Sequence, residues 1–161
     1  MAIWQFNVEL IPATWLAAGN DIESLFGEEG FDALPAWAAY EDPGLEQRLG
    51  MLLPRSRSWN PAQIVWGSQD GNDIRLSRRH EGIGCVAVHF DLRNPNMLLI
   101  RAIADLARDL ELAILVPEVR RIATSDVEAL LRFAAESSAA HFVLDPQSFL
   151  SQLDTVSERA N

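Results

Sequence analysis

The amino-acid sequence predicts an α+β protein: a single domain with a mixed, mostly antiparallel sheet, one strand-helix-strand crossover and flanking short helices. A length of 161 residues suits one domain with its own core. Hydrophobic residues make up 48% of the chain and charged residues 22%, as in globular proteins. Segments with the period of a strand alternate with segments that have the period of a helix. We expect residues 1–154 to form the domain and residues 155–161 to form a frayed tail.

The chain begins with a predicted strand. From Trp4 to Leu10 the even positions are apolar and the odd positions are polar, which is the period of a half-buried strand, and Pro12 ends it. Residues 13–53 have a helical pattern that glycines and prolines interrupt, so we expect two or three short helices there. Residues 54–63 contain two prolines and little periodicity, which indicates a loop.

A β-hairpin is predicted next. Residues 64–66 and 74–76 are its apolar strands, and the turn between them contains Asp70 and Gly71. We expect Gly71 to supply the positive φ that a tight turn requires.

The clearest unit is a strand, a helix and a second strand. Residues 85–92 alternate between large apolar side chains and a smaller, more polar set. A helix should follow, with Asn94 as its N-cap and Pro95 in its first turn. The apolar run of residues 112–116 then predicts a buried strand, parallel to the first.

Two helices are expected near the end of the chain. Ser125 and Glu128 have the spacing of a capping box in front of an amphipathic segment. Asp145 and Pro146 should begin a short helix that runs through Leu153.

Charge is distributed very unevenly along the chain. Residues 1–47 hold nine carboxylates and no Lys or Arg, whereas the remainder holds 13 Arg and 14 acids. The formal net charge is −10, so phosphate and anionic lipid surfaces should repel the chain. We therefore predict no nucleic-acid and no membrane partner. The single cysteine, Cys85, fits a reducing compartment, and we expect a cytoplasmic protein without a signal peptide.

Few residues offer chemistry. Cys85, His89 and Asp91 alternate along one strand and should project from one face. Cys85 and His89 are two same-face steps apart, each roughly 7 Å, which is too far for a direct hydrogen bond. We therefore favour a half-buried histidine packed beneath the N-terminal helices. The alternative is a small hydrolase or transferase that uses these three residues and takes an anion in the Arg-rich loops.

Neither a metal nor a cofactor is predicted, since the glycines lack a phosphate-binding pattern and the Cys and His residues lack zinc-ligand spacing. The Arg-rich loops should be solvated or paired with the acidic third of the chain. They contain Arg55, Arg57, Arg75, Arg78 and Arg79.

The acidic N-terminal third is the candidate binding surface. Aromatic residues alternate there with carboxylates, a composition that suits a protein interface with a basic partner. The alternative is an ordinary pair of helices with aromatics inside and acids in water, and both interpretations can hold together. We expect a protein without enzymatic activity, with Trp37 and Tyr40 as interface anchors. The predicted partner-binding residues are Asp21, Glu23, Glu28, Glu29, Asp32, Trp37, Tyr40, Glu41, Asp42 and Glu46.

Three stretches carry a resemblance to other proteins: MAIWQFNVELIP at residues 1–12, VWG at residues 65–67, and HFDLRNPNMLLIRAIADLARDLELAIL at residues 89–115. They resemble small uncharacterised bacterial proteins of the polymorphic-toxin immunity type. These stretches are structural, so the resemblance carries over no catalytic residue. It implies a compact acidic protein that blocks a basic toxin, often a nuclease, by occupying its phosphate-binding cleft. A subunit that only completes a larger assembly is a further possibility.

Overall fold

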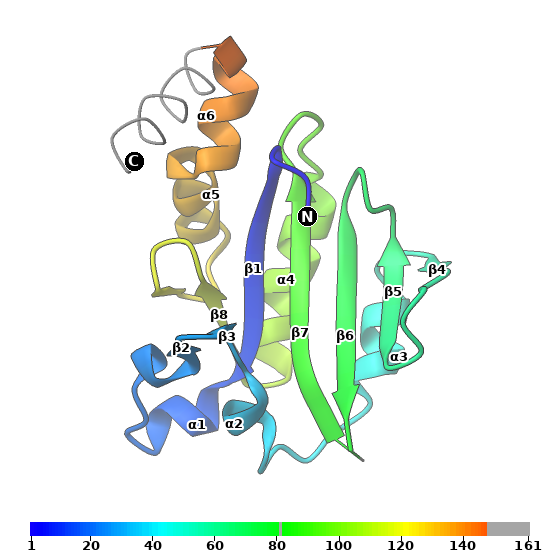
Figure 1. Cartoon of the computed structure of the whole chain (residues 1–161), viewed down its shortest axis with the longest axis vertical. Helices are drawn as coiled ribbons and strands as arrows, with labels where there is room; N and C mark the ends of the chain where they lie inside the picture. The colour runs from blue at the N-terminus through cyan, green and yellow to red at the C-terminus, as the bar shows by residue number, and fades with distance from the viewer. Residues whose placement is uncertain (81, 148–161) are drawn as a thin grey trace.

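A seven-stranded sheet forms the centre of the protein in the computed structural model, which describes residues 1–80 and 82–147 (Figure 1). The strand order is β4-β5-β6-β7-β1-β8-β9, and every neighbouring pair is antiparallel. The strands are β1 (Gln5–Pro12), β4 (Arg55–Ser56), β5 (Gln63–Gly67), β6 (Asp73–Arg79), β7 (Gly82–Asp91), β8 (Leu112–Val116) and β9 (Arg121–Ala123). The predicted α+β class with a mostly antiparallel sheet is confirmed.

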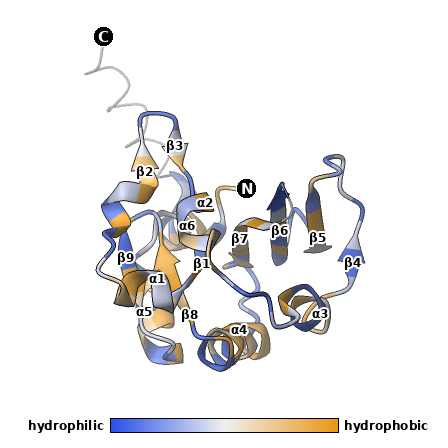
Figure 2. Ribbon diagram, turned by 90° about the horizontal axis from the view of Figure 1, so that it is seen from below, coloured by the Kyte–Doolittle hydropathy of each residue, from blue (hydrophilic) through white to orange (hydrophobic). Residues whose placement is uncertain are grey.

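The helices and a small hairpin lie on both sides of this sheet. Figure 2 shows α3 and α4 on one side, with α2 and the β2–β3 hairpin on the other. The helical elements are α1 (Ala13–Ala17), a 3-10 helix η1 (Ile22–Leu25), α2 (Leu34–Trp37), α3 (Leu45–Gly50), α4 (Met97–Asp109), α5 (Val127–Glu136) and α6 (Ser138–Leu144). The hairpin consists of β2 (Phe26–Gly27) and β3 (Gly30–Phe31). No described helix is long and apolar enough to cross a membrane.

The N-terminal strand β1 lies in the interior of the sheet. It pairs with β7 on one side and β8 on the other, antiparallel to both. Strands β7 and β8 therefore run in the same direction, as the crossover through α4 predicted. They do not pair with each other, because β1 fills the place between them.

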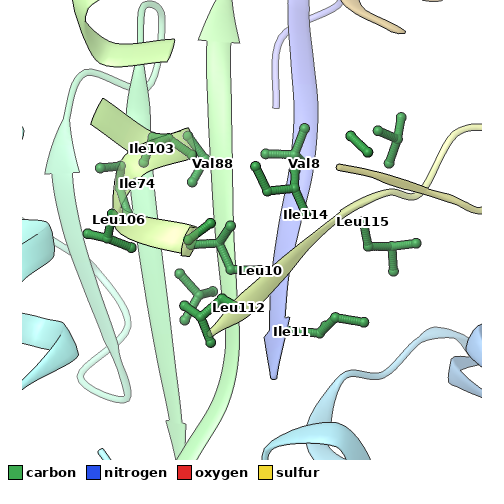
Figure 3. Close-up of a cluster of buried hydrophobic side chains, with 14 of the residues drawn as sticks. Val8, Leu10, Ile11, Ile74, Val88, Ile103, Leu106, Leu112, Ile114 and Leu115 are labelled. Carbon is green, nitrogen blue, oxygen red and sulfur yellow. The ribbon is translucent and has the colours of Figure 1, made fainter. Parts of the chain in front are cut away.

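The apolar face of the sheet packs against α4. Even positions of β1 and β7 share this face, since Val8 pairs with Val88 and Leu10 with Val86. Figure 3 shows Val8, Leu10 and Val88 in one cluster with Ile103 and Leu106 of α4, and all five are at most 3% exposed. Fully burying one such side chain is worth about 1.5–3 kcal/mol, so this face supplies much of the folding free energy.

Both predicted N-caps are wrong by one or two residues. The side chain that accepts a hydrogen bond from the first turn of α4 is Asn96, bonded to the amide of Leu99 at 3.0 Å, rather than Asn94. In α5 the cap is Asp126, which accepts from the amide of Glu128, rather than Ser125. In both cases the residue directly before the first helical residue is placed to reach the free N–H groups.

The turn chemistry of the β5–β6 hairpin also differs from the prediction. Positive φ occurs at Gly67, with a value of 88°, and not at Gly71. A side chain at Gly67 would meet the backbone carbonyl of Asn72, so glycine is required there for space as well as for conformation. The hairpin itself is confirmed.

The end of the chain is described only in part. Helix α6 ends at Leu144, before the helix predicted from Asp145 to Leu153. Most of that helix, and the whole predicted tail of residues 155–161, lie outside the described residues.

Candidate functional site

The second face of the sheet is polar across its three central strands. Odd positions of β1, β6 and β7 project there, and the register places Asn7, His89 and Asp73 side by side. We call this the polar face, and its members are Gln5, Asn7, Glu9, Asp73, Arg75, Ser77, Cys85, Ala87, His89 and Asp91. Several of them are buried, which makes this face a candidate site.

Asp73 is the centre of a buried ionic network. Its carboxylate lies 2.6 Å from Nδ1 of His89 and accepts two hydrogen bonds from Arg75, at 3.0 and 2.9 Å. Burial opposes ionisation of Asp73, but the hydrogen bonds from His89 and Arg75 outweigh it, so its pKa lies below the ordinary 3.8. Asp73 is fully buried and His89 is 5% exposed. The network fixes the orientation of the imidazole ring.

The structure does not bring Cys85, His89 and Asp91 together as a catalytic group. They share one face, as predicted, but His89 pairs with Asp73, and Asp91 pairs with Arg93 at 2.8 Å. Arg93 in turn stacks over the ring of Trp4 at 4.1 Å. The sequence analysis missed Asp73 as the partner of His89, because only the register of β6 against β7 brings these two residues together.

The environment of Cys85 disfavours a thiolate. Burial raises the pKa of its thiol, and the nearby carboxyl of Glu9 raises it further. Hydrogen bonds with Ser77 act in the opposite direction but do not compensate. Since the thiolate is the nucleophilic form, this position is a poor one for covalent chemistry at neutral pH.

Glu9 is a buried carboxyl with no ion pair among residues 1–80 and 82–147. It is 7% exposed, and its Oε2 atom has no hydrogen-bond partner within the described part of the chain. Burial raises its pKa to about 8 from an ordinary 4.5, so the group is largely protonated at neutral pH. The remaining titratable groups offer no metal centre, because no cluster of three or more His, Cys, Asp or Glu in residues 1–80 and 82–147 could hold an ion.

The acidic N-terminal third forms a second candidate site, centred on the β2–β3 hairpin. Glu28 and Glu29 are the two residues that connect its strands, and both are exposed. The rings of Phe26 and Phe31 face each other across the hairpin with centroids 5.1 Å apart. Gly30 follows the turn with a φ of 108°, a conformation that favours glycine. Figure 2 shows the hairpin standing off the sheet on the side away from α4.

Arginines neutralise some acids of this segment and leave others unpaired. Glu23 pairs with Arg120 at 2.7 Å, Asp32 with Arg79 at 3.8 Å, and Glu46 with both Arg78 and Arg55, at 2.6 and 3.7 Å. The prediction that the Arg-rich loops pair with the acidic third is therefore confirmed for Arg55, Arg78 and Arg79, whereas Arg75 pairs with Asp73. Asp21 and Asp42 accept hydrogen bonds from nearby backbone amides. Glu28, Glu29 and Glu41 have neither an ion pair nor a hydrogen bond within the described residues.

Trp37 and Tyr40 do not form the exposed anchors that the sequence suggested. Trp37 is 3% exposed and belongs to the hydrophobic core, and Tyr40 is half-buried against it, with the rings edge to face at 4.9 Å. Burial raises the pKa of Tyr40, and Asp42 and Glu111 raise it further. These rings hold the segment against the sheet, so the acids are displayed by aromatic residues that face inwards.

The comparisons with known proteins add no relative to this description. No protein-family model matches the chain, no curated protein matches it, and no solved structure matches it.

Proposed function

We propose that this protein is a non-enzymatic binding module, an inhibitor of the immunity type, whose acidic surface binds a basic partner protein. The surface comprises the exposed acids between residues 21 and 46, with the β2–β3 hairpin as its projecting part. In this proposal the protein acts in the cytoplasm, and a toxin with a cationic active-site cleft is the kind of partner that fits.

One observation carries the proposal: the charge at the hairpin tip is displayed without a counter-charge. Glu28 and Glu29 are adjacent, exposed and unpaired within the described residues, although the chain pairs Glu23 and Asp32 nearby with arginines. Two adjacent like charges on a hairpin repel each other, and a purely structural turn gains nothing from them. A cationic partner would convert this repulsion into attraction.

The hairpin is also held in place before any partner arrives. The guanidinium of Arg120 lies 4.6 Å from the centroid of the Phe26 ring while it pairs with Glu23. Phe26 packs on Phe31, and both pack against the core. A binding element that is already ordered loses less conformational entropy on association. Exposed carboxylates on such an element would speed the encounter with a basic protein, and salt would weaken that effect.

A pull-down from a lysate of the source organism tests the proposal, with the chain as bait at low and high salt. We expect one basic protein to be recovered in stoichiometric amount at low salt and to be lost at high salt. The double variant Glu28→Lys and Glu29→Lys should lose it at both salt concentrations, because it reverses the charge at the hairpin tip.

The matched control reverses two exposed acids on the other side of the sheet, Asp105→Lys on α4 and Glu136→Lys on α5. Its net charge equals that of the hairpin variant, so recovery by the control separates a local contact from a general charge effect. Equal recovery by all three proteins would show that the hairpin acids are not the binding surface.

The enzymatic alternative is tested by thiol titration. An enzyme that used Cys85 as a nucleophile would need a reactive thiolate, and the raised pKa predicts slow labelling at pH 7. Labelling of the folded protein should become as fast as that of a free thiol only after unfolding in urea. Fast labelling of the folded chain would revive the hydrolase or transferase hypothesis.

A further inference from the structure

A cavity lies beside the acidic surface, between β1, α6 and the turn that joins β8 to β9. Its volume is about 440 Å³, within the range of sites that hold small ligands or single side chains. The apolar part of its lining comes from Met1, Ile3, Pro117 and Ala139. The polar part comes from Gln5, Asn7, Glu118 and Ser138, and no Lys or Arg is among the described residues that line it.

Glu118 gives the cavity a fixed negative charge. Its Oε1 atom accepts hydrogen bonds from the backbone amide of Ser138, at 2.9 Å, and from the Ser138 hydroxyl. Both bonds go to one oxygen, so the second carboxylate oxygen has no partner within the described part of the chain. The carboxylate is therefore oriented and still able to accept hydrogen bonds from a cation.

Asn7 adds an unused amide to the cavity wall. Its Oδ1 atom is enclosed and has no hydrogen-bond partner among the described residues, and its side-chain nitrogen makes no hydrogen bond there either. An amide group that turns by 180° exchanges its oxygen for its nitrogen, so Asn7 can present an acceptor to a donor in the cavity. An unpaired amide is costly, and a ligand with N–H donors would satisfy it.

One short turn of the chain contributes residues to both the cavity and the acidic surface. Glu118 and Arg120 both belong to the turn between β8 and β9, and Arg120 pairs with Glu23 and covers Phe26 of the hairpin. A partner that contacts the hairpin would therefore lie next to the cavity mouth.

We infer that this cavity receives the cationic side chain of an Arg or Lys residue, with the charged group at Glu118 and Asn7 and the aliphatic stem against Met1, Ile3 and Pro117. Long basic side chains combine an apolar stem with a charged head, which is the combination that this lining offers. The inference rests on the proposed function in one respect: it takes the side chain to be supplied by the basic partner that binds the hairpin.

The test uses small probes and the full chain, so it needs no identified partner. N-acetyl-arginine amide is titrated into ¹⁵N-labelled protein, and the neutral isostere N-acetyl-citrulline amide is titrated in parallel. We expect the arginine probe to cause saturable shifts at the amides of Asn7, Glu118 and Ser138, with a dissociation constant on the order of millimolar. The citrulline probe should shift them much less.

Two variants locate the effect. Glu118→Gln should weaken binding of the arginine probe by at least about fivefold, because it removes the charge from the hydrogen bond. The second variant, Asn7→Ala, should also weaken binding of the arginine probe, because it removes the side-chain amide from the cavity. The chemical-shift dispersion of each spectrum shows whether the variant is folded. The control Asp105→Asn, at an exposed residue of α4 outside the cavity lining, should bind the probe as the wild type does.

Equal shifts with both probes, undiminished binding by Glu118→Gln, or no shift at these amides would overturn the inference. Each of these results concerns the cavity alone. If the double variant Glu28→Lys and Glu29→Lys still recovers the partner in the pull-down, the proposed function is overturned instead. The two failures are therefore distinguishable.

Discussion

The two faces of the central sheet are made by the same strands and are built in opposite ways. On one face Val8, Leu10 and Val88 meet α4 without a polar group between them. On the other, Asp73 and His89 form a buried ionic network in which each member depends on its partner. The apolar face therefore stabilises the fold by the surface area that it removes from water, whereas the polar face is stable only while its hydrogen bonds are complete.

The largest expected effect is on the apolar face. Leu10→Ala removes a fully buried side chain opposite α4 and should lower the free energy of unfolding by about 3–4 kcal/mol. Urea denaturation followed by circular dichroism measures it. The control Leu98→Ala, at a residue of α4 that is 78% exposed, should change stability by less than about 0.5 kcal/mol. Similar losses for both would mean that the packing against α4 is not what stabilises the sheet.

A somewhat smaller loss is expected from the polar face. Asp73→Asn removes the negative charge and replaces one of the two acceptor oxygens with an NH2 donor that faces Arg75 or His89, so it should cost about 2–3 kcal/mol near neutral pH. The folded-state pKa of Asp73 lies below 3.8, so the stability it adds is present above that pH and is lost as the pH falls through the lower folded value. The difference between wild type and variant, measured by urea denaturation from pH 7 down to pH 3, should shrink accordingly.

The exposed ion pair between Asp105 and Arg108 is the control for the prediction at Asp73. Asp105→Asn should change the free energy of unfolding by less than about 0.5 kcal/mol, because solvent screens exposed ion pairs. A loss at Asp73 no larger than the loss at Asp105 would refute the view that the network stabilises the polar face.

Glu9 should give an effect of the opposite sign. In the folded protein it keeps its proton up to about pH 8, whereas the unfolded chain loses it near pH 4.5, so the stability of the wild type falls as the pH rises between these values. Glu9→Gln lacks this dependence and should be more stable than the wild type by on the order of 2 kcal/mol at pH 9. At pH 5 the two proteins should differ little. Thermal unfolding at both pH values measures this, and a wild type whose stability does not fall over this range would show that Glu9 has a solvated or paired carboxylate.

The smallest effect on stability is expected at the hairpin tip. Glu28→Gln with Glu29→Gln removes two exposed charges that make no ion pair or hydrogen bond within the described residues, so the free energy of unfolding should change by less than about 0.5 kcal/mol. Differential scanning calorimetry measures it at low salt. A large destabilisation would mean that these acids support the fold, which would remove the reason to regard them as a displayed surface.

The larger elements could be predicted because each is long enough to show its period. Strand β1 alternates from Gln5 to Leu10 and α4 keeps Leu99, Ile103 and Leu106 on one stripe, so both follow from the sequence. Strands β2, β3 and β4 contain two residues each, and β9 contains three, which is too short for any period to appear. Each of them pairs with a strand that is close in the chain, but no alternation of side chains marks where the pairing begins and ends.

The candidate site could likewise be predicted only in part. The exposed acids and the shared face of Cys85, His89 and Asp91 follow from composition and from the alternation of a strand. The bond between His89 and Asp73 does not, because it requires the register of β6 against β7. Periodicity also cannot show which aromatic residues of the acidic segment face inwards. The burial of Trp37 depends on the packing of α2 against β7 and β1, which are distant from it in sequence.

The position of β1 also governs the order in which the chain can fold. Strand β1 is synthesised before both of its neighbours in the sheet, β7 and β8, which end at Asp91 and Val116. Its apolar even positions therefore have no partner in β7 until residues 86–90 have been synthesised, and Leu10 has none in β8 until Ile114 has been synthesised. Pairings so distant in sequence are slow to form and leave an unpaired strand edge open to aggregation. A nascent chain arrested before Val116 should consequently be a substrate for chaperones, whereas one released after the β8–β9 turn can close its sheet.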